Sequence, residues 1–159
     1  PSWHTQYPRL RLSEWDSWKA VVDWSVPLYP RRPLTPPLQA LVDEWRKESA
    51  DDAGRIIQAL RFVQDQVGYT AIEIGLGAYQ PTDPATVLER RYGDCKDKAL
   101  LLVTLLAAMN IEARPALVNT WLGEEIEKAL PGVFERHIVA PELVRLVAPA
   151  DAGHEPPTR

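Results

Sequence analysis

Hydrophobic residues recur every three to four positions along most of this chain, a spacing typical of helices that each bury one face. The pattern predicts a short helix at 13–24 and further helices at 37–48, 53–67, 84–91 and from 95 to about 109. Such helices can form a core only by packing their apolar faces on one another. The chain is therefore expected to fold around a group of packed helices.

Capping residues mark the ends of several of these helices. Ser13 stands where the N-cap of the first is expected, and Gly68 stands where a C-cap glycine would end the third. The helix after Cys95 has the strongest pattern, since Asp94 can cap its start and Asn110 occupies the position of a left-handed C-cap residue. Its apolar residues cover so much of its circumference that we expect burial on most sides.

Shorter apolar runs predict strands between and after the helices. They lie at 69–74, at 111–118 and, as two strands with a break near Pro141, at 134–147. A further short helix is expected at about 123–129. No internal repeat is visible in the sequence.

Prolines organise the first part of the chain. Five of the 15 prolines lie in residues 27–37, which cannot be helical because each lacks an amide donor and restrains the residue before it. A linker between domains or a loop laid over a core would explain this stretch, and we favour the loop because helices resume immediately. We expect an N-terminal segment with the first helix at 1–30, the core at 31–148 and a disordered, small and polar tail at 149–159.

Composition limits the classes of function. The chain has 159 residues, of which 45% are hydrophobic and 25% charged, as in an ordinary globular domain. Its net charge of −4 gives no reason to expect a nucleic-acid partner, since phosphate binding needs a concentrated basic surface. No stretch approaches the ~20 apolar residues of a membrane span. One cysteine rules out an internal disulfide framework.

That single cysteine, Cys95, is the main candidate for chemistry. It lies in the first turn of the strongest helix, where unpaired amides and the helix dipole favour a thiolate. An imidazole partner must come from His4, His137 or His154, and His137 is the one held by a predicted strand. The backbone amide of Cys95 can supply one donor to a developing oxyanion. The alternative is that Cys95 is a small, buried and unreactive residue.

Charged residues flank Cys95 on both sides. Asp94 and Asp97 serve as helix caps in the plainest interpretation, and as carboxylates they would oppose a thiolate. Lys96 and Lys98 offset part of that charge and are otherwise expected at the solvated surface. A structural zinc site needs four ligands, usually in closely spaced pairs, and the sequence contains no such pair, so we expect no metal.

The residues around the cysteine closely resemble bacterial transglutaminase-like domains. The most specific block is Gly93-Asp94-Cys95-Lys96-Asp97-Lys98, and the resemblance covers roughly Trp15 to Val139. Its other segments are Tyr92, Ala99, Leu101-Leu102, Asn110-Ile111-Glu112-Ala113, Leu117-Val118-Asn119-Thr120, Phe62-Val63-Gln64-Asp65, Tyr69, Tyr79-Gln80-Pro81, Leu130-Pro131-Gly132 and Phe134-Glu135-Arg136-His137-Ile138-Val139.

The resemblance implies an α+β, papain-like fold, with helices packed on a small antiparallel sheet and the nucleophile at a buried helix N-terminus. A Cys-His-Asp triad is implied where helix and sheet join, and Cys95 matches its nucleophile and His137 its general base. The family's aspartate normally follows on the next strand, after an aromatic-rich segment ending in Asp-Pro-Thr. This chain lacks that segment, so Asp151 is the candidate and Glu142 a distant second.

Substrate contacts are expected near this triad. Tyr79 and Gln80 lie in a matching segment, and Trp121 lies in a loop near the proposed site. The resemblance implies no metal or organic cofactor. It suggests a longer protein, with a β-rich domain before this segment, in the bacterial periplasm or cell envelope.

Two functions remain open. The shared chemistry of the family implies attack of a thiolate on a protein or peptide amide, a thioester intermediate, and then hydrolysis or transfer to an amine. The other possibility is a weakened site on the same fold, used as a protein-binding or scaffold module. The departure from the family pattern after His137 favours this second interpretation.

Overall fold

The computed structural model describes residues 13–71, 75–119, 131, 137–138 and 145–146, with the strand residues from 118 onward described by their backbone alone. The elements are α1 Trp18–Ser25, η1 Val26–Leu28, α2 Pro36–Glu48, α3 Asp52–Asp65, β1 Gly68–Tyr69, η2 Gly75–Ala78, α4 Pro84–Arg90, β2 Tyr92–Gly93, α5 Cys95–Ala108, β3 Ala113–Arg114, β4 Val118–Asn119, β5 His137–Ile138 and β6 Arg145–Leu146.

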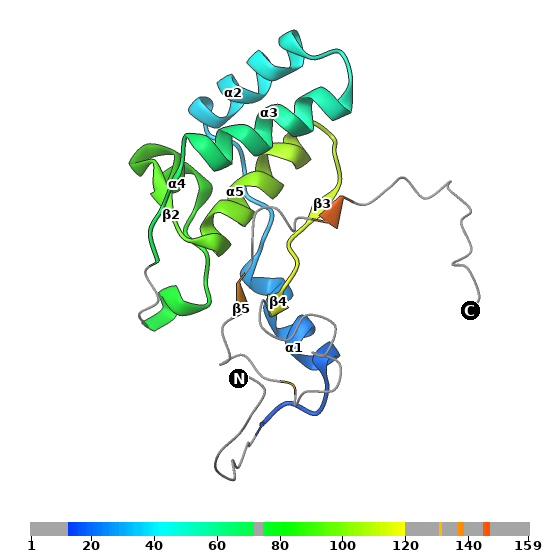
Figure 1. The fold of residues 1–159 in the computed structure, drawn as a ribbon, viewed down its shortest axis with the longest axis vertical. Coiled ribbons are helices and arrows are strands. Elements are labelled where there is room, and N and C mark those ends of the chain that lie inside the picture. The colour runs from blue at the N-terminus through cyan, green and yellow to red at the C-terminus, as the bar shows by residue number, and fades with distance from the viewer. Residues whose placement is uncertain (1–12, 72–74, 120–130, 132–136, 139–144, 147–159) are drawn as a thin grey trace, which may run out of the picture.

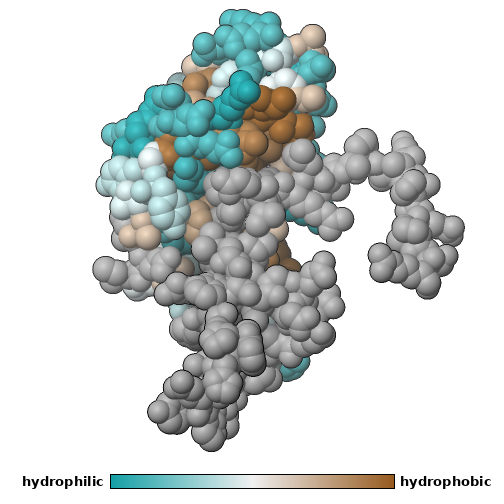
Figure 2. Space-filling view, viewed as in Figure 1, coloured by the Kyte–Doolittle hydropathy of each residue, from teal (hydrophilic) through white to brown (hydrophobic). Residues whose placement is uncertain are grey.

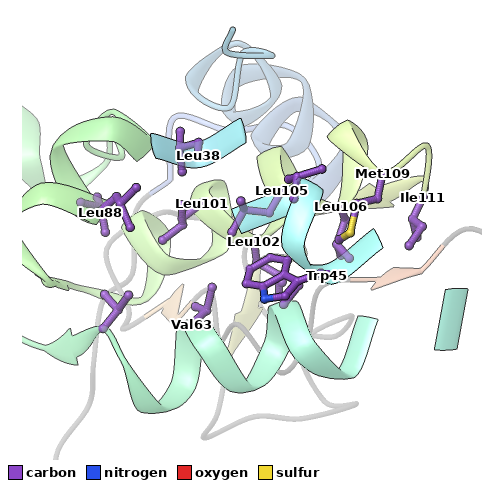
Figure 3. Close-up of a cluster of buried hydrophobic side chains, with 14 residues drawn as sticks. Leu38, Trp45, Val63, Leu88, Leu101, Leu102, Leu105, Leu106, Met109 and Ile111 are labelled. Carbon is purple, nitrogen blue, oxygen red and sulfur yellow. The ribbon is translucent and has the colours of Figure 1, made fainter. Parts of the chain in front are cut away.

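The helix α5 is the centre of the hydrophobic core. It packs against α2, α3 and α4, which surround it in Figure 1. Figure 3 shows the side chains of these four helices meeting in one cluster, with Leu101 and Leu105 of α5 fully buried within it. Burying a leucine contributes roughly 1.5–3 kcal/mol. The predicted burial of this helix on most sides is confirmed.

The face of this helical part seen in Figure 2 is largely polar. In the view of Figure 2, most of the coloured surface over α2, α3 and α4 is hydrophilic, with smaller hydrophobic areas between. This is the arrangement that the helical periodicity predicts, because each helix turns its apolar stripe toward α5. Trp45 of α2 follows the same rule, with 6% of its surface exposed and its ring centroid 5.5 Å from that of Phe62 in α3.

The described strands form three short ladders. β1 and β2 run parallel, with Gly68 opposite Tyr92, whereas β3 pairs with β6 and β4 with β5 in antiparallel register. The α+β class is therefore confirmed. The expectation of a sheet that is antiparallel throughout is wrong for β1–β2, because the short helix α4 returns the chain to run in the same direction beside β1.

Two predicted helix ends were wrong. The first helix begins at Trp18 rather than Ser13, because Ser17 is its N-cap, and the side chain of Ser13 instead accepts the Trp15 amide in a local turn (3.0 Å). Gly68 does not cap α3. That helix ends at Asp65 with a right-handed C-cap, and the Gly68 amide donates to the Arg91 carbonyl (2.8 Å) as part of the β1–β2 ladder.

The other predicted helix boundaries from residue 36 to residue 109 agree with the structure to within a residue or two. Asn110 has a positive φ of 63°, as expected of a left-handed residue at a helix end. The predicted strand at 111–118 consists of two short strands, and Pro115, which has no amide donor, lies between them.

The proline-rich connector is a loop, as favoured, but the prediction that all of residues 27–37 are non-helical is wrong at both ends. η1 includes Pro27, and α2 begins at Pro36, because proline fits the first turn of a helix, where no amide donor is needed. The connector residue Leu34 packs against the core cluster, as a loop laid over a core requires.

The strand predicted at 69–74 is shorter than expected, since β1 ends at Tyr69 and residues 70–71 are not strand, while 72–74 lie outside the described residues. The predicted helix at 123–129 and the tail at 149–159 also lie outside the described residues. The division into 1–30, 31–148 and 149–159 stays a prediction.

Candidate active site

Cys95 is the first residue of α5, and a complete capping box fixes the position of this helix start. The Asp94 carboxylate accepts the amides of Lys96 (3.2 Å) and Asp97 (3.3 Å), while the Asp97 carboxylate accepts the Asp94 amide (3.2 Å). These bonds satisfy amides that have no partner within a helix. The thiol is therefore carried by a rigid turn.

The environment of the Cys95 thiol combines burial with a positive helix end. Only 8% of the residue is exposed, so the expectation of a buried cysteine and that of a cysteine at a helix N-terminus both hold. Burial alone favours the neutral thiol, whereas the dipole at the start of a helix favours the thiolate. The charged groups next to the thiol therefore decide how reactive it is.

The two lysines beside Cys95 are buried, which corrects the expectation of a solvated surface. Lys96 is 5% exposed and forms an ion pair with Asp94, which is 2% exposed. Lys98 is 7% exposed, and its ammonium group donates to the carbonyl of Val67 (2.8 Å). Buried ammonium groups require partners of this kind, and here the Val67 carbonyl between α3 and β1 and the capping residue Asp94 supply them.

Asp97 joins three segments at the start of α5. One of its carboxylate oxygens accepts the backbone amide of Thr82 (2.7 Å), and the other accepts the Arg90 guanidinium (2.7 Å). Arg90 also donates to the Tyr92 carbonyl (2.6 Å). Arg90, rather than Lys98, is thus the counter-ion of Asp97.

Gly93 is required here by space. A Cβ at this position would lie 2.8 Å from the Asp97 Cβ and 3.0 Å from one of its carboxylate oxygens. The φ angle of Gly93 is not positive, so ordinary residues could adopt its backbone conformation. The glycine before the Asp-Cys pair therefore allows the Asp97 side chain to reach back to the backbone of Asp94.

Tyr29 approaches the site from the proline-rich connector. Burial raises the pKa of its phenol well above the usual value of 10, and the neighbouring Cys95, Asp94 and Asp97 raise it further. Tyr29 follows η1 directly, and its amide donates to the Val26 carbonyl (3.1 Å). The phenol is therefore neutral at any physiological pH, and it lies close enough to Cys95 for the charge of a thiolate to affect it.

The sequence analysis missed Tyr29, Thr82 and Arg90 as parts of this site. Tyr29 lies far from the cysteine along the chain and in a connector without periodicity. Arg90 and Asp97 are separated by the end of one helix and the start of the next, so helical spacing could not relate them. Only the arginine's place just before the Gly-Asp-Cys block could have indicated a role.

The predicted partners of Cys95 differ in how far the structure describes them. His137 begins β5 and lies opposite Asn119 of β4 in the antiparallel ladder, which agrees with its predicted place on a strand. Its side chain lies outside what the structure describes, so its role as a base stays a prediction. Asp151, Glu142 and Trp121 also lie outside the described residues.

The predicted substrate contacts Tyr79 and Gln80 directly follow η2. Both of their amides donate to the Leu76 carbonyl (3.1 and 2.9 Å), and the Tyr79 ring packs edge-on against Trp24 of α1 at 5.6 Å. Because the bond from Thr82 to Asp97 attaches the next residues to α5, this segment is tied to the same helix start as Cys95. A role of Tyr79 and Gln80 in binding stays a prediction.

Two further observations concern the described part of the chain. Within it, no group of three or more His, Cys, Asp or Glu side chains is arranged to hold a metal ion. Nor does any helix there combine the length and the apolar character needed to span a membrane.

Comparison with known proteins gives one match. A family model described as the transglutaminase-like superfamily matches residues 39–142, which is more than half of the chain and includes both Cys95 and His137. No curated protein and no solved structure matches the chain.

Proposed function

The chain belongs to the transglutaminase-like superfamily, and we propose that it catalyses cysteine-dependent acyl transfer or hydrolysis on protein or peptide amides. The superfamily indicates cysteine-based acyl chemistry in general. The observation that carries the specific proposal is the position of Cys95, the only cysteine, as the first residue of a buried and fully capped helix. That is the position in which a helix dipole stabilises a thiolate best.

In the proposed reaction, the Cys95 thiolate attacks the carbonyl carbon of an amide and forms a carbon–sulfur bond. The backbone amide of Cys95 would donate to the resulting oxyanion. As the carbon–nitrogen bond breaks, the leaving amine takes a proton from the His137 imidazolium, and a thioester remains on Cys95. Water or a primary amine then attacks this thioester, gives its proton to His137, and releases an acid or a new amide with the thiolate restored.

Other residues would assist this reaction. Asp151 is proposed to orient the His137 ring, as the third member of a triad does. Tyr79, Gln80 and Trp121 are proposed to contact the substrate. Support for the first two is that their segment is bonded to the start of α5 through Thr82.

The first experiment measures the rate of alkylation of Cys95 by iodoacetamide as a function of pH. The reading is unambiguous because no other thiol is present. We expect a thiolate to form well below the usual thiol pKa of about 8.5, and this activation to be lost in His137→Ala. His4→Ala is the matched control, since it removes an imidazole that the proposal does not use.

The second possible function is a protein-binding module with a weakened site. It is favoured by the sequence after His137, which lacks the aromatic segment and the Asp-Pro-Thr of the family. An ordinary thiol titration that is indifferent to His137 would reject the enzyme and support this alternative. An activated thiol would instead justify a search for acyl donors with glutamine-containing and glycine-containing peptides, with release of ammonia or peptide as the readout.

A further inference from the structure

The charges around Cys95 are arranged as two closed pairs. Asp94 is paired with Lys96, and Asp97 is paired with Arg90 at 2.7 Å. Both carboxylates are almost fully buried, with 2% and 4% exposure, so solvent screens them little. A carboxylate that would oppose a thiolate is thus balanced in each case by its own cation.

The second pair differs from the first in where its cation comes from. Lys96 lies on α5 itself, whereas Arg90 is the last residue of α4 and reaches across to α5. Arg90 also donates to the Tyr92 carbonyl and to the Thr82 hydroxyl (3.3 Å). Its guanidinium therefore joins α4, β2 and the loop before α4 to the turn that carries Cys95.

We propose that Arg90 is a positioning residue for the nucleophile, because it neutralises Asp97 beside Cys95 and holds the first turn of α5 in place. This inference rests on the proposed function, in which Cys95 reacts as a thiolate. It assigns to Arg90 a role in reactivity that acts through Asp97 and needs no contact with the substrate.

The other groups facing Cys95 do not replace Arg90. Of the described residues on the neighbouring elements, Tyr29 is neutral, Lys96 is paired with Asp94, and Lys98, although charged, donates to the Val67 carbonyl between α3 and β1. Removing the guanidinium would leave Asp97 as a buried carboxylate without its ion-pair partner, two residues from the thiol. A charge in direct contact with a titrating group shifts its pKa by about one unit or more. Asp97 is two residues from Cys95 along α5, so we expect the thiol pKa to shift by less, about 0.5–1 unit.

The test compares the pH profile of Cys95 alkylation in the parent and in five variants of the 159-residue chain. Arg90→Gln removes the cation, and Asp97→Asn removes the carboxylate while keeping an oxygen that can accept the Thr82 amide. The double variant Arg90→Gln/Asp97→Asn removes both charges. Arg91→Gln is the matched control, because the neighbouring arginine lies over the Phe62 ring, at 5.3 Å, and not at Asp97.

If Arg90 acts by balancing the charge of Asp97, the two single variants should shift the thiol pKa in opposite directions. The apparent thiol pKa should rise by about 0.5–1 unit in Arg90→Gln, so that alkylation at pH 6 slows by roughly 3–10-fold. It should fall in Asp97→Asn and return to within about 0.3 unit of the parent in the double variant. Arg91→Gln should leave the pH profile unchanged. Arg90→Lys, which keeps a positive charge at this position, should keep the thiol pKa close to that of the parent.

Equal shifts of the thiol pKa in the same direction in both single variants, or no shift in either, would overturn the proposal. A merely structural role would not make the two substitutions shift this pKa in opposite directions. Circular dichroism shows whether each variant is folded. If Arg90→Gln is not folded, the test rests on Asp97→Asn alone, in which the thiol pKa must be lower than in the parent. The proposed function fails separately. It is rejected when the parent chain titrates as an ordinary thiol that is indifferent to His137, whereas the differences between these variants remain measurable in that case.

Discussion

Replacing Gly93 by alanine tests how tightly the start of α5 is built. The added Cβ would lie 2.8 Å from the Asp97 Cβ, a separation that real structures essentially never show. Asp97 cannot move away cheaply, because its carboxylate is held by the Thr82 amide, the Arg90 guanidinium and the Asp94 amide at 2.7–3.2 Å. The backbone must therefore shift, or the capping box must open.

The expected cost follows from these two outcomes. Overpacking a well-packed site costs roughly 1–3 kcal/mol, and loss of an N-cap interaction about 1 kcal/mol. We expect the free energy of unfolding to fall by about 2 kcal/mol. With a slope of about 2 kcal/mol/M, typical of a small protein in urea, the denaturation midpoint should fall by about 1 M.

Gly68→Ala is the matched control for this experiment. Gly68 lies in the same two-strand ladder, also without a positive φ, but the nearest atom to its added Cβ is the Arg91 carbonyl oxygen at an ordinary 3.6 Å. Alanine there should be neutral or stabilise by a few tenths of a kcal/mol through the unfolded state. Urea denaturation followed by tryptophan fluorescence measures both variants, and equal midpoints for the two would refute the reasoning from space.

Three further outcomes are expected. Leu101→Ala should lower the free energy of unfolding by about 2–5 kcal/mol in urea, because Leu101 is fully buried in the α5 core; a loss below about 1 kcal/mol would contradict that placement. Cys95→Ala should abolish alkylation and change the free energy of unfolding by less than about 1 kcal/mol, whereas a large loss would favour the unreactive, buried cysteine. Because the pKa of Tyr29 is raised by folding, the unfolded chain loses this proton first, so the parent should lose stability relative to Tyr29→Phe as the pH rises above about 10. Urea denaturation at pH 8 and pH 10.5 measures that difference, and an unchanged difference would show that Tyr29 is not buried beside these charges.

Much of the helical part could be predicted because its signals are local. Asp94 caps α5 and Asn110 ends it in a left-handed conformation, as their positions in the sequence indicate. The same local logic misplaced the first helix, since Ser13 and Ser17 are both good caps and only one of them precedes the helix that packs.

The candidate site was only partly predictable, for a different reason. Cys95 was found from its place at a helix start, but the groups that set its charge come from other elements. Arg90 from α4, Thr82 from the loop before it and Tyr29 from the connector are brought to Asp97 or Cys95 by packing. No periodicity relates these positions, and the lysines beside the cysteine read as surface residues until their buried partners are known.

The sequence by itself determined where the helices α2 to α5 lie, that α5 is the buried one, and which thiol stands at its start. These properties depend on residues within a few positions of one another, through periodicity and capping. Only the tertiary structure decided which cation balances each carboxylate, why Gly93 has no room for a side chain, and that Lys96 and Lys98 are buried. Electrostatic interactions and packing depend on distances in space. Residues far apart in the sequence come within these distances only when α4, β2 and the connector pack around α5.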